Sequence, residues 1–244
     1  MEPIFRQTFT LSDIHLDPFG RVKPSVLLYF AQEVAGQHCQ LLQLDWDTLS
    51  HQNLFWAVTR HRVQITRLPV RGETITVETW PMPTTRVAFP RNVVAFDQDG
   101  NELFRSISIW VLMDTVTRAM ILPGKSGVNV PGLLQGSELE MPASIPPAGL
   151  MGGQSRQVRF TDLDINGHMN NCRYLDWAWD LLPSHFHKDR TLQAFTLGYL
   201  SEAREGDSLL QQLETGEDGT VKLEISRPEG EKNTRIFCAR LMYS

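Results

Sequence analysis

Residues 161–171 read TDLDINGHMNN, and residues 172–182 continue as CRYLDWAWDLL. Three polar residues whose side chains can do chemistry, Asp164, Asn166 and His168, occupy every second position of the first segment. Asn170 and Asn171 follow, and asparagine is a favoured helix N-cap. Behind them an apolar stripe has helical spacing (Tyr174, Leu175, Trp177, Ala178 and Leu181). The pattern predicts a polar cluster just before, or on, the N-terminal end of a buried helix.

The end of such a helix suggests a chemical use for the polar cluster. The first N–H groups of a helix have no partner within the helix and carry partial positive charge. They suit a carbonyl oxygen that becomes an oxyanion during a reaction. A plainer interpretation exists for aspartates before a helix, which are commonly loop or capping residues. We expect that structural use for Asp162 and a chemical one for Asp164.

The segment and a later stretch resemble the signature of a known family. The order Asp-Leu-Asp-x-Asn-x-His-x-Asn-Asn-x-x-Tyr is similar to that of the acyl-acyl-carrier-protein thioesterases, hotdog-fold enzymes that end fatty-acid synthesis in plants and have bacterial relatives. The catalytic Asp, Asn and His of the family match Asp164, Asn166 and His168. Its downstream catalytic Glu, in a Tyr-x-x-Glu-Cys-type stretch before a turn, matches Glu202.

The resemblance implies both a fold and an activity. The implied fold is α+β, a tandem double hotdog in which each half is an antiparallel β-sheet wrapped around a central α-helix. The implied activity is hydrolysis of the thioester of fatty acyl-acyl-carrier-protein, which releases free fatty acid in fatty acid biosynthesis. The plant enzymes have Cys after the catalytic Glu, whereas this chain has Ala203. That departure argues against a cysteine nucleophile at this position.

Hydrophobic periodicity divides the chain into two similar halves. In the first half, residues 4–11 alternate as a strand does, and Pro24 opens a helix that runs to about residue 43. Strands are predicted at 55–68, 73–80, 86–96, 101–113 and 119–123, with an Asp-Gly hairpin turn at 97–100. In the second half, a strand is predicted at 157–160, a helix at 173–182, and strands at 192–202, 209–214, 220–227 and 234–243.

Between the halves, Gly and Pro recur from 123 to 153 without any periodicity, which is typical of a linker or a crossover. We therefore predict an N-terminal hotdog domain at 1–125, a linker at 126–153 and a catalytic C-terminal hotdog domain at 154–244. The halves also read as a divergent duplication, with residues 12–17 aligned to 161–166. In that alignment Phe19 is the counterpart of His168. Counting back four residues from the Gly of each following turn, Gly72 and Gly206, makes Leu68 the counterpart of Glu202. We expect one catalytic site, in the second half, and an N-terminal domain that is non-catalytic and lines an acyl pocket.

Composition excludes several classes of protein. The chain has 244 residues, of which 41% are hydrophobic and 21% charged, as in ordinary globular proteins. No apolar run is as long as a membrane span, and residues 1–6 resemble neither a secretory signal nor a transit peptide. A net charge of −5 disfavours a nucleic-acid partner. A bacterial cytoplasmic enzyme, either a monomer or a homodimer, is the simplest expectation.

The three cysteines, Cys39, Cys172 and Cys238, are odd in number and match no metal-binding spacing. We expect free, mostly buried thiols in a reducing compartment. Cys172 lies four residues after His168, so a Cys–His nucleophile has to be considered. However, it would lie one or two residues inside the helix, at a position that the chemistry of the family does not use. No cofactor and no metal is expected, because the spacing of Asp164, Asn166 and His168 matches no common zinc site.

The expected partner is an acyl carrier protein that bears a fatty acyl chain. Carrier proteins are acidic, so binding one requires a local basic patch on a chain of negative net charge. The candidate basic residues are Arg86, Arg91, Arg118, Lys125, Arg156, Arg159 and Arg173. Scattered, solvated charges are an equally good interpretation of any one of them.

The four site residues allow one division of labour. Glu202 would act as general base on water, while Asn166 and the helix N–H groups would bind the oxyanion. His168 would orient the water or the substrate, or protonate the leaving thiolate. Asp164 would orient His168 and Asn166, or would itself attack the carbonyl carbon to give an anhydride. The sequence leaves direct attack by water and a covalent acyl-aspartate both open.

Two other functions are also open. One is an acyl-coenzyme A thioesterase of the same fold, because both substrates carry a pantetheine arm. The other is a non-catalytic acyl-binding or dehydratase-like hotdog protein. Against simple binding, four polar groups in an apolar site cost stability unless they are used.

Overall fold

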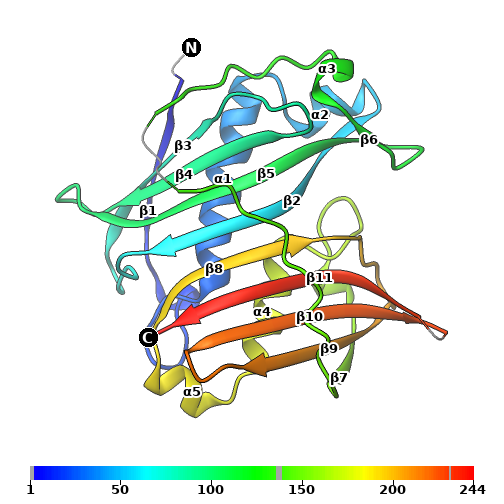
Figure 1. Ribbon diagram of the computed structural model, residues 1–244. Helices are drawn as coiled ribbons and strands as arrows, with labels where there is room; N and C mark the ends of the chain where they lie inside the picture. Colours follow the sequence, from blue (N-terminus) through cyan, green and yellow to red (C-terminus); the bar gives the residue numbers. More distant parts are fainter. Residues whose placement is uncertain (1–2, 136–138, 231) are drawn as a thin grey trace. The chain divides into compact units, whose positions relative to one another are not determined.

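The computed structural model describes residues 3–135, 139–230 and 232–244. Met1 and Glu2, Gly136 of the predicted linker and Glu231 of the last predicted turn lie outside the described residues. The chain divides into two compact units, Met1–Pro142 and Ala143–Ser244 (Figure 1). The predicted domain limits of 1–125, 126–153 and 154–244, and the roles assigned to these segments, stay a proposal.

The first unit is an antiparallel sheet with a long helix packed against it. Its strands are β1 (Phe5–Thr10), β2 (Leu54–Ile65), β3 (Thr74–Pro81), β4 (Phe89–Phe96), β5 (Glu102–Asp114) and β6 (Met120–Ile121). They pair in the order β1-β3-β4-β5-β2, and β6 pairs with β5. The helix α1 (Pro24–Leu41) contacts β1 and β3 (Figure 1). This is the predicted arrangement of one helix followed by a strand meander.

The helix α1 forms because its ends and its spacing both favour it. Pro24 occupies the first helical position, where the missing N–H costs nothing. Apolar residues at helical spacing are buried along one face, among them Leu27, Phe30 and Val34. The ring of Phe30 stacks on Phe9 of β1 with the centroids 4.5 Å apart. Burial of this face against the sheet makes the core of the unit.

The second unit repeats the architecture. Its elements are β7 (Gln154–Gln157), α4 (Asn171–Asp180), β8 (Leu192–Tyr199), β9 (Ser208–Thr215), β10 (Thr220–Glu229) and β11 (Lys232–Tyr243). The strands pair in the order β7-β9-β10-β11-β8, the same order as in the first unit (Figure 1). Tyr174 of α4 stacks on Phe237 of β11 with ring centroids 5.0 Å apart. The helix therefore packs against β11, an inner strand of its sheet.

Several elements differ from the prediction. The strand expected at 157–160 lies at Gln154–Gln157, and Phe160 is 75% exposed in a 3₁₀ turn. Glu202 lies beyond the end of β8, in the connection to β9. Three short helices were not predicted: α2 (Trp46–Ser50), α3 (Pro123–Ser126) and α5 (Ser184–Asp189). Among the described residues, no helix is long and apolar enough to cross a membrane.

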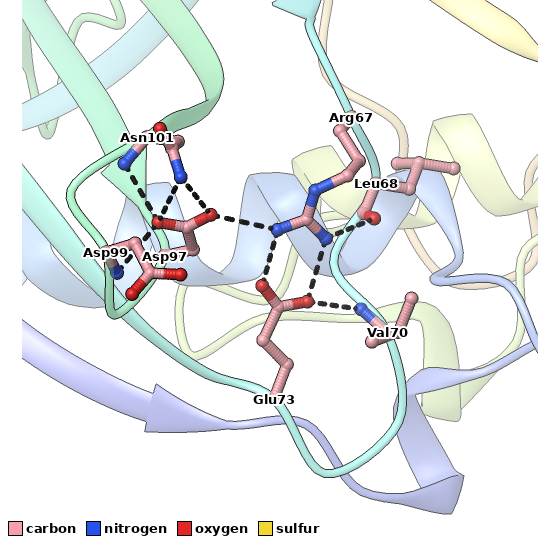
Figure 2. A network of polar contacts seen from close by, with 7 residues as sticks. All are labelled: Arg67, Leu68, Val70, Glu73, Asp97, Asp99 and Asn101. Atoms are coloured by element: carbon pink, nitrogen blue, oxygen red, sulfur yellow. Dashed lines mark hydrogen bonds and ion pairs between the residues drawn. The ribbon is translucent and has the colours of Figure 1, made fainter.

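The turn between β2 and β3 is held by a network of polar contacts (Figure 2). The Glu73 carboxylate accepts the backbone N–H of Val70 at 2.7 Å and the Arg67 guanidinium at 2.6 Å. Arg67 also donates to Asp97, at the end of β4, at 3.2 Å. The hydrogen bond from Arg67 is the main reason why the pKa of Glu73 lies below its ordinary value. Leu68, the predicted counterpart of Glu202, lies in this turn and has no carboxylate.

Matching backbone bonds fix how the two units correspond. The N–H of Leu11 donates to the C=O of Glu73, and the N–H of Val158 donates to the C=O of Asp207, both at 2.9 Å. Leu11 is thus the counterpart of Val158, which aligns residue 14, not residue 12, with residue 161. The predicted alignment is wrong by two residues. Because both segments alternate polar and apolar positions, a slip of two residues preserves the pattern and the sequence does not reveal it.

The corrected alignment changes the counterparts of all three signature residues in the first unit. The pairs are Asp17 with Asp164, Phe19 with Asn166, and Arg21 with His168. The predicted pairing of Phe19 with His168 is therefore wrong. The pairing of Leu68 with Glu202 agrees with the structure, because each lies two residues before the N–H that bonds the carboxylate of its turn.

Candidate active site

The signature residues form a tight loop between an η2 turn (Phe160–Asp162) and α4. Leu163 and Met169 form an antiparallel bridge across the base of the loop. Inside it, the N–H of Asp164 donates to the C=O of His168 at 2.8 Å, and the N–H of Gly167 donates to the C=O of Asp164 at 3.0 Å. Gly167 has φ of +72°, a left-handed conformation that glycine adopts without a steric penalty. The backbone therefore reverses direction between Asp164 and His168.

The Asp164 side chain bonds to the loop itself. Its Oδ1 accepts the N–H of Asn166 at 2.8 Å and the N–H of His168 at 3.3 Å. Asp164 is half-buried, whereas Asn166 is exposed. The carboxylate thus ties together the backbones of the other two signature residues.

The imidazole of His168 faces the carboxylate of Glu202. Nε2 of His168 lies 3.2 Å from Oε2 of Glu202, and the side chains are 13% and 38% exposed. The backbones run side by side here, because His168 forms an antiparallel bridge with Arg204, and the N–H of Met169 donates to the C=O of Ala203 at 2.8 Å. The structure therefore brings the predicted carboxylate and imidazole into contact, while the catalytic roles of Asp164, Asn166, His168 and Glu202 stay a proposal.

Two arginines that the sequence analysis did not single out complete the surroundings of Glu202. Nη2 of Arg204 lies 3.9 Å from Oε2 of Glu202, at the exposed side of the pair. Arg227 of β10 donates to the C=O of Glu202 at 3.3 Å and to the Asp207 carboxylate at 3.1 Å. Asp207 in turn accepts the N–H of Arg204 at 3.0 Å. The turn that carries Glu202 is thus held by the same kind of carboxylate–arginine contact as the turn of Glu73.

The helix end behind the loop is capped, as predicted, but its N–H groups are used differently. Asn170 is the N-cap, and its Oδ1 accepts the N–H of Cys172 at 2.9 Å. The N–H of Arg173 donates to the C=O of Asn170 at 2.9 Å. Two of the N–H groups expected to bind an oxyanion are therefore already engaged. The loop also carries the exposed side-chain amide of Asn166, which is a further possible donor.

Asp162 has the structural use that we expected. It is only 3% exposed and its carboxylate accepts the N–H of Arg159 at 3.0 Å. It also accepts the indole N–H of Trp177 at 3.3 Å and the Arg173 guanidinium at 3.3 Å. These contacts join the η2 turn to α4 and set the direction in which the helix leaves the loop.

Cys172 is the second residue of α4 and is fully buried. Burial raises the pKa of its thiol, and the nearby Asp176 raises it further. Since the thiolate is the nucleophilic form, this position is unsuited to attack a thioester. Burial also raises the pKa of Cys39 and of Cys238.

The candidate basic residues do not all lie on the surface. Arg91 is only 6% exposed and donates to His38 and Thr79, so its proposed place in a docking patch is wrong. Arg156 bonds Asp180 at 2.7 Å, and Arg173 bonds Asp162 and Asp176. Arg118 lies over the ring of Phe55. Arg86, Lys125 and Arg159 are exposed.

Two family models match the chain and together cover most of it. The model described as acyl-ACP thioesterase N-terminal domain matches residues 2–122, and that described as acyl-ACP thioesterase C-terminal domain matches residues 153–239. Among curated proteins, a chloroplastic palmitoyl-acyl carrier protein thioesterase of Gossypium hirsutum is 27% identical over 90% of this chain and 56% of its own length. A chloroplastic dodecanoyl-[acyl-carrier-protein] hydrolase of Cinnamomum camphora is 27% identical, over 89% of this chain and 60% of its own length. The chain thus spans little more than half of these relatives.

Solved structures show the same fold over the whole chain. An acyl-ACP thioesterase from Bacteroides thetaiotaomicron superposes with a TM-score of 0.90 at 24% identity, covering 99% of this chain and 98% of that one. The 12:0-ACP thioesterase from Umbellularia californica superposes with a TM-score of 0.84 at 23% identity, covering 100% of this chain and 98% of that one. The expected fold class, a tandem double hotdog of the α+β class, is confirmed.

Proposed function

The chain belongs to the acyl-acyl-carrier-protein thioesterase family, and from that premise we propose that it hydrolyses the thioester of fatty acyl-acyl-carrier-protein and releases free fatty acid. The observation that supports the proposal most strongly is the 3.2 Å contact between His168 and Glu202 in the second unit. The first unit has Arg21 and Leu68 at these two places, so we propose a single catalytic site.

In the proposed reaction Glu202 is the general base. Its carboxylate takes one proton from a water molecule, and the water oxygen forms a bond to the carbonyl carbon of the thioester. The carbonyl oxygen becomes negative and accepts a hydrogen bond from the side-chain amide of Asn166. The C–S bond then breaks, and the leaving thiolate takes a proton from His168. The proton that Glu202 took from water then passes to His168 across their contact, so both side chains regain their starting protonation states.

The geometry is compatible with this division of labour. A proton on Nε2 of His168 can be shared with Oε2 of Glu202 at 3.2 Å, within reach for a hydrogen bond. The largely exposed guanidinium of Arg204 lies 3.9 Å from Oε2 of Glu202. Asp164 completes the proposed catalytic set, either by orienting Asn166 and His168 or by attacking the carbonyl carbon itself.

The proposed substrate carrier is acyl carrier protein. The exposed residues Arg86, Lys125 and Arg159 remain candidates for contact with this acidic partner. A cytoplasmic location and a monomeric or homodimeric state belong to the same proposal.

The decisive experiment compares a panel of fatty acyl chains presented on acyl carrier protein and on coenzyme A. Faster hydrolysis of the carrier-protein thioesters at equal chain length supports the proposal. Preference for coenzyme A thioesters supports the alternative of an acyl-coenzyme A thioesterase. Hydrolysis of neither, together with tight binding of acyl carrier protein, leaves the non-catalytic alternative and contradicts the proposal.

A further inference from the structure

The same loop occurs twice in the chain, once in each unit. In the first unit Oδ1 of Asp17 accepts the N–H of Phe19 at 2.8 Å and the N–H of Arg21 at 2.9 Å. In addition, the N–H of Asp17 donates to the C=O of Arg21 at 2.7 Å, and that of Gly20 donates to the C=O of Asp17 at 3.0 Å. Gly20 has φ of +76°. Each of these features has its equivalent in the loop of Asp164.

The flanks of the two loops correspond as well. Leu16 bridges Val22 in the first unit, as Leu163 bridges Met169 in the second. The N–H of Lys23 donates to the C=O of His15 at 3.0 Å, and the N–H of Asn170 to the C=O of Asp162 at 2.8 Å. The two backbones therefore follow the same course from the 3₁₀ turn to the helix.

Most of the side chains that would do chemistry differ between the loops. The first unit has Phe19 where the second has Asn166, and Arg21 where the second has His168. Leu68 takes the place of Glu202. Only the aspartate is shared. An aspartate that persists in a loop without amide, imidazole or facing glutamate serves the loop and not a reaction.

From this comparison, and given the proposed thioesterase activity, we propose that Asp164 is a positioning residue and not a nucleophile. Its Oδ1 holds the N–H groups of Asn166 and His168, and this fixes where the amide and the imidazole project. The hydrolysis then proceeds by direct attack of water activated by Glu202. No covalent bond between Asp164 and the acyl group forms.

The Asp164 carboxylate has two properties that can be tested separately. It accepts hydrogen bonds, and it carries a negative charge. Asparagine at this position keeps the Oδ1 acceptor but has neither the charge nor the nucleophilicity of aspartate. Charge-assisted hydrogen bonds are about twice as strong as neutral ones. Asp164→Asn should therefore weaken the hydrogen bonds to the N–H groups of Asn166 and His168 but keep them formed. Asp164→Ala removes the acceptor altogether. Asp17→Asn and Asp17→Ala make the same changes in the first unit.

The experiment measures kcat, KM and the pH dependence of kcat for the four variants, with one fatty acyl-acyl-carrier-protein as the substrate. We expect Asp164→Asn to lower kcat by no more than about tenfold, with the pH dependence of the wild type. We expect Asp164→Ala to lower kcat by about a hundredfold through misplacement of the reacting groups, with little change in KM. Both Asp17 variants are expected to keep the wild-type kcat, and Asp17→Ala to lower the melting temperature about as much as Asp164→Ala does.

Amide hydrogen exchange provides a readout that does not depend on activity. The N–H groups of Asn166 and His168 should stay protected in Asp164→Asn and lose protection in Asp164→Ala. The proposal would be overturned if Asp164→Asn were as inactive as Asp164→Ala while its N–H groups stayed protected from exchange. That result would show that the reaction requires the negative charge itself. Unprotected N–H groups already in the wild type would overturn it as well. If the wild type hydrolyses no acyl thioester, the proposed function fails, while exchange still decides whether Asp164 holds the loop.

Discussion

His168 and Glu202 lie on separate connections of the second unit, and their side chains meet with Nε2 and Oε2 3.2 Å apart. The contact depends on a short run of backbone pairing in which His168 bridges Arg204 and Met169 donates to Ala203. The imidazole and the carboxylate are therefore held by main-chain geometry on both sides. This explains how two residues outside regular strands and helices can be held against each other.

The left-handed conformations of Gly167 and Gly20 predict that the same substitution lowers stability in both units but lowers kcat only in the second. Gly167→Ala forces an alanine into a left-handed conformation, which costs roughly 1–2 kcal/mol, and should displace His168 and lower kcat. Gly20→Ala is the matched control, because Gly20 has φ of +76° and, like Gly167, has nothing within 4 Å of an added Cβ. It should lower the free energy of unfolding by a similar amount with kcat unchanged. Equal kcat in both variants would contradict the assignment of the site to the second unit.

The buried thiol of Cys172 predicts that activity does not depend on it. Cys172→Ala should retain the wild-type kcat, while the loss of buried volume lowers the free energy of unfolding by about 1 kcal/mol. Measurement of kcat and of urea unfolding on the same sample checks both parts. Complete loss of hydrolysis in a folded variant would instead support a thiol mechanism.

The lowered pKa of Glu73 predicts how one contact depends on pH. A carboxyl group with a lowered folded-state pKa stabilises the fold above its ordinary pKa, and this contribution is lost as the pH falls through the folded value. Glu73→Gln should therefore lower the free energy of unfolding at pH 7 by less than about 1 kcal/mol, because Arg67 is partly exposed. The difference from wild type should vanish well below pH 4.5, the ordinary pKa of the glutamate.

The control for this measurement is Glu217→Gln, which alters an exposed glutamate in a turn of the second unit. It should leave the free energy of unfolding unchanged at both pH values. A Glu73→Gln effect that persists undiminished in acid would show that the side chain acts through packing and not through its charge.

Much of the fold could be predicted from local signals. Pro24 begins α1, Asn170 caps α4, and the Asp-Gly turn at 97–100 joins β4 to β5. The short helices were missed because a helix such as α3, with four residues, is about one turn long and shows no apolar periodicity. The repeat was aligned wrongly by two residues because residues 13–17 and 162–166 each alternate polar and apolar positions, so a shift of two keeps most of the pattern.

The candidate site shows a similar division. The signature and the family resemblance pointed to His168 and Glu202, whose contact the structure contains. Arg204 and Arg227 were missed because nothing in their local sequence distinguishes them from solvated charges. The bond from the Cys172 N–H to the Asn170 side chain follows from the predicted cap, and it removes one of the N–H groups that were expected to bind an oxyanion.

The central claim, that Glu202 activates water beside His168, is tested most directly by Glu202→Gln, with Glu205→Gln as the exposed neighbouring control. The measurement is kcat for hydrolysis of acyl-acyl-carrier-protein by both variants, with melting temperatures to show that they are folded. Glutamine keeps the shape of the side chain but cannot take a proton, so kcat should fall about 10²–10⁴-fold, while Glu205→Gln retains the wild-type value. Wild-type hydrolysis by folded Glu202→Gln would contradict the account.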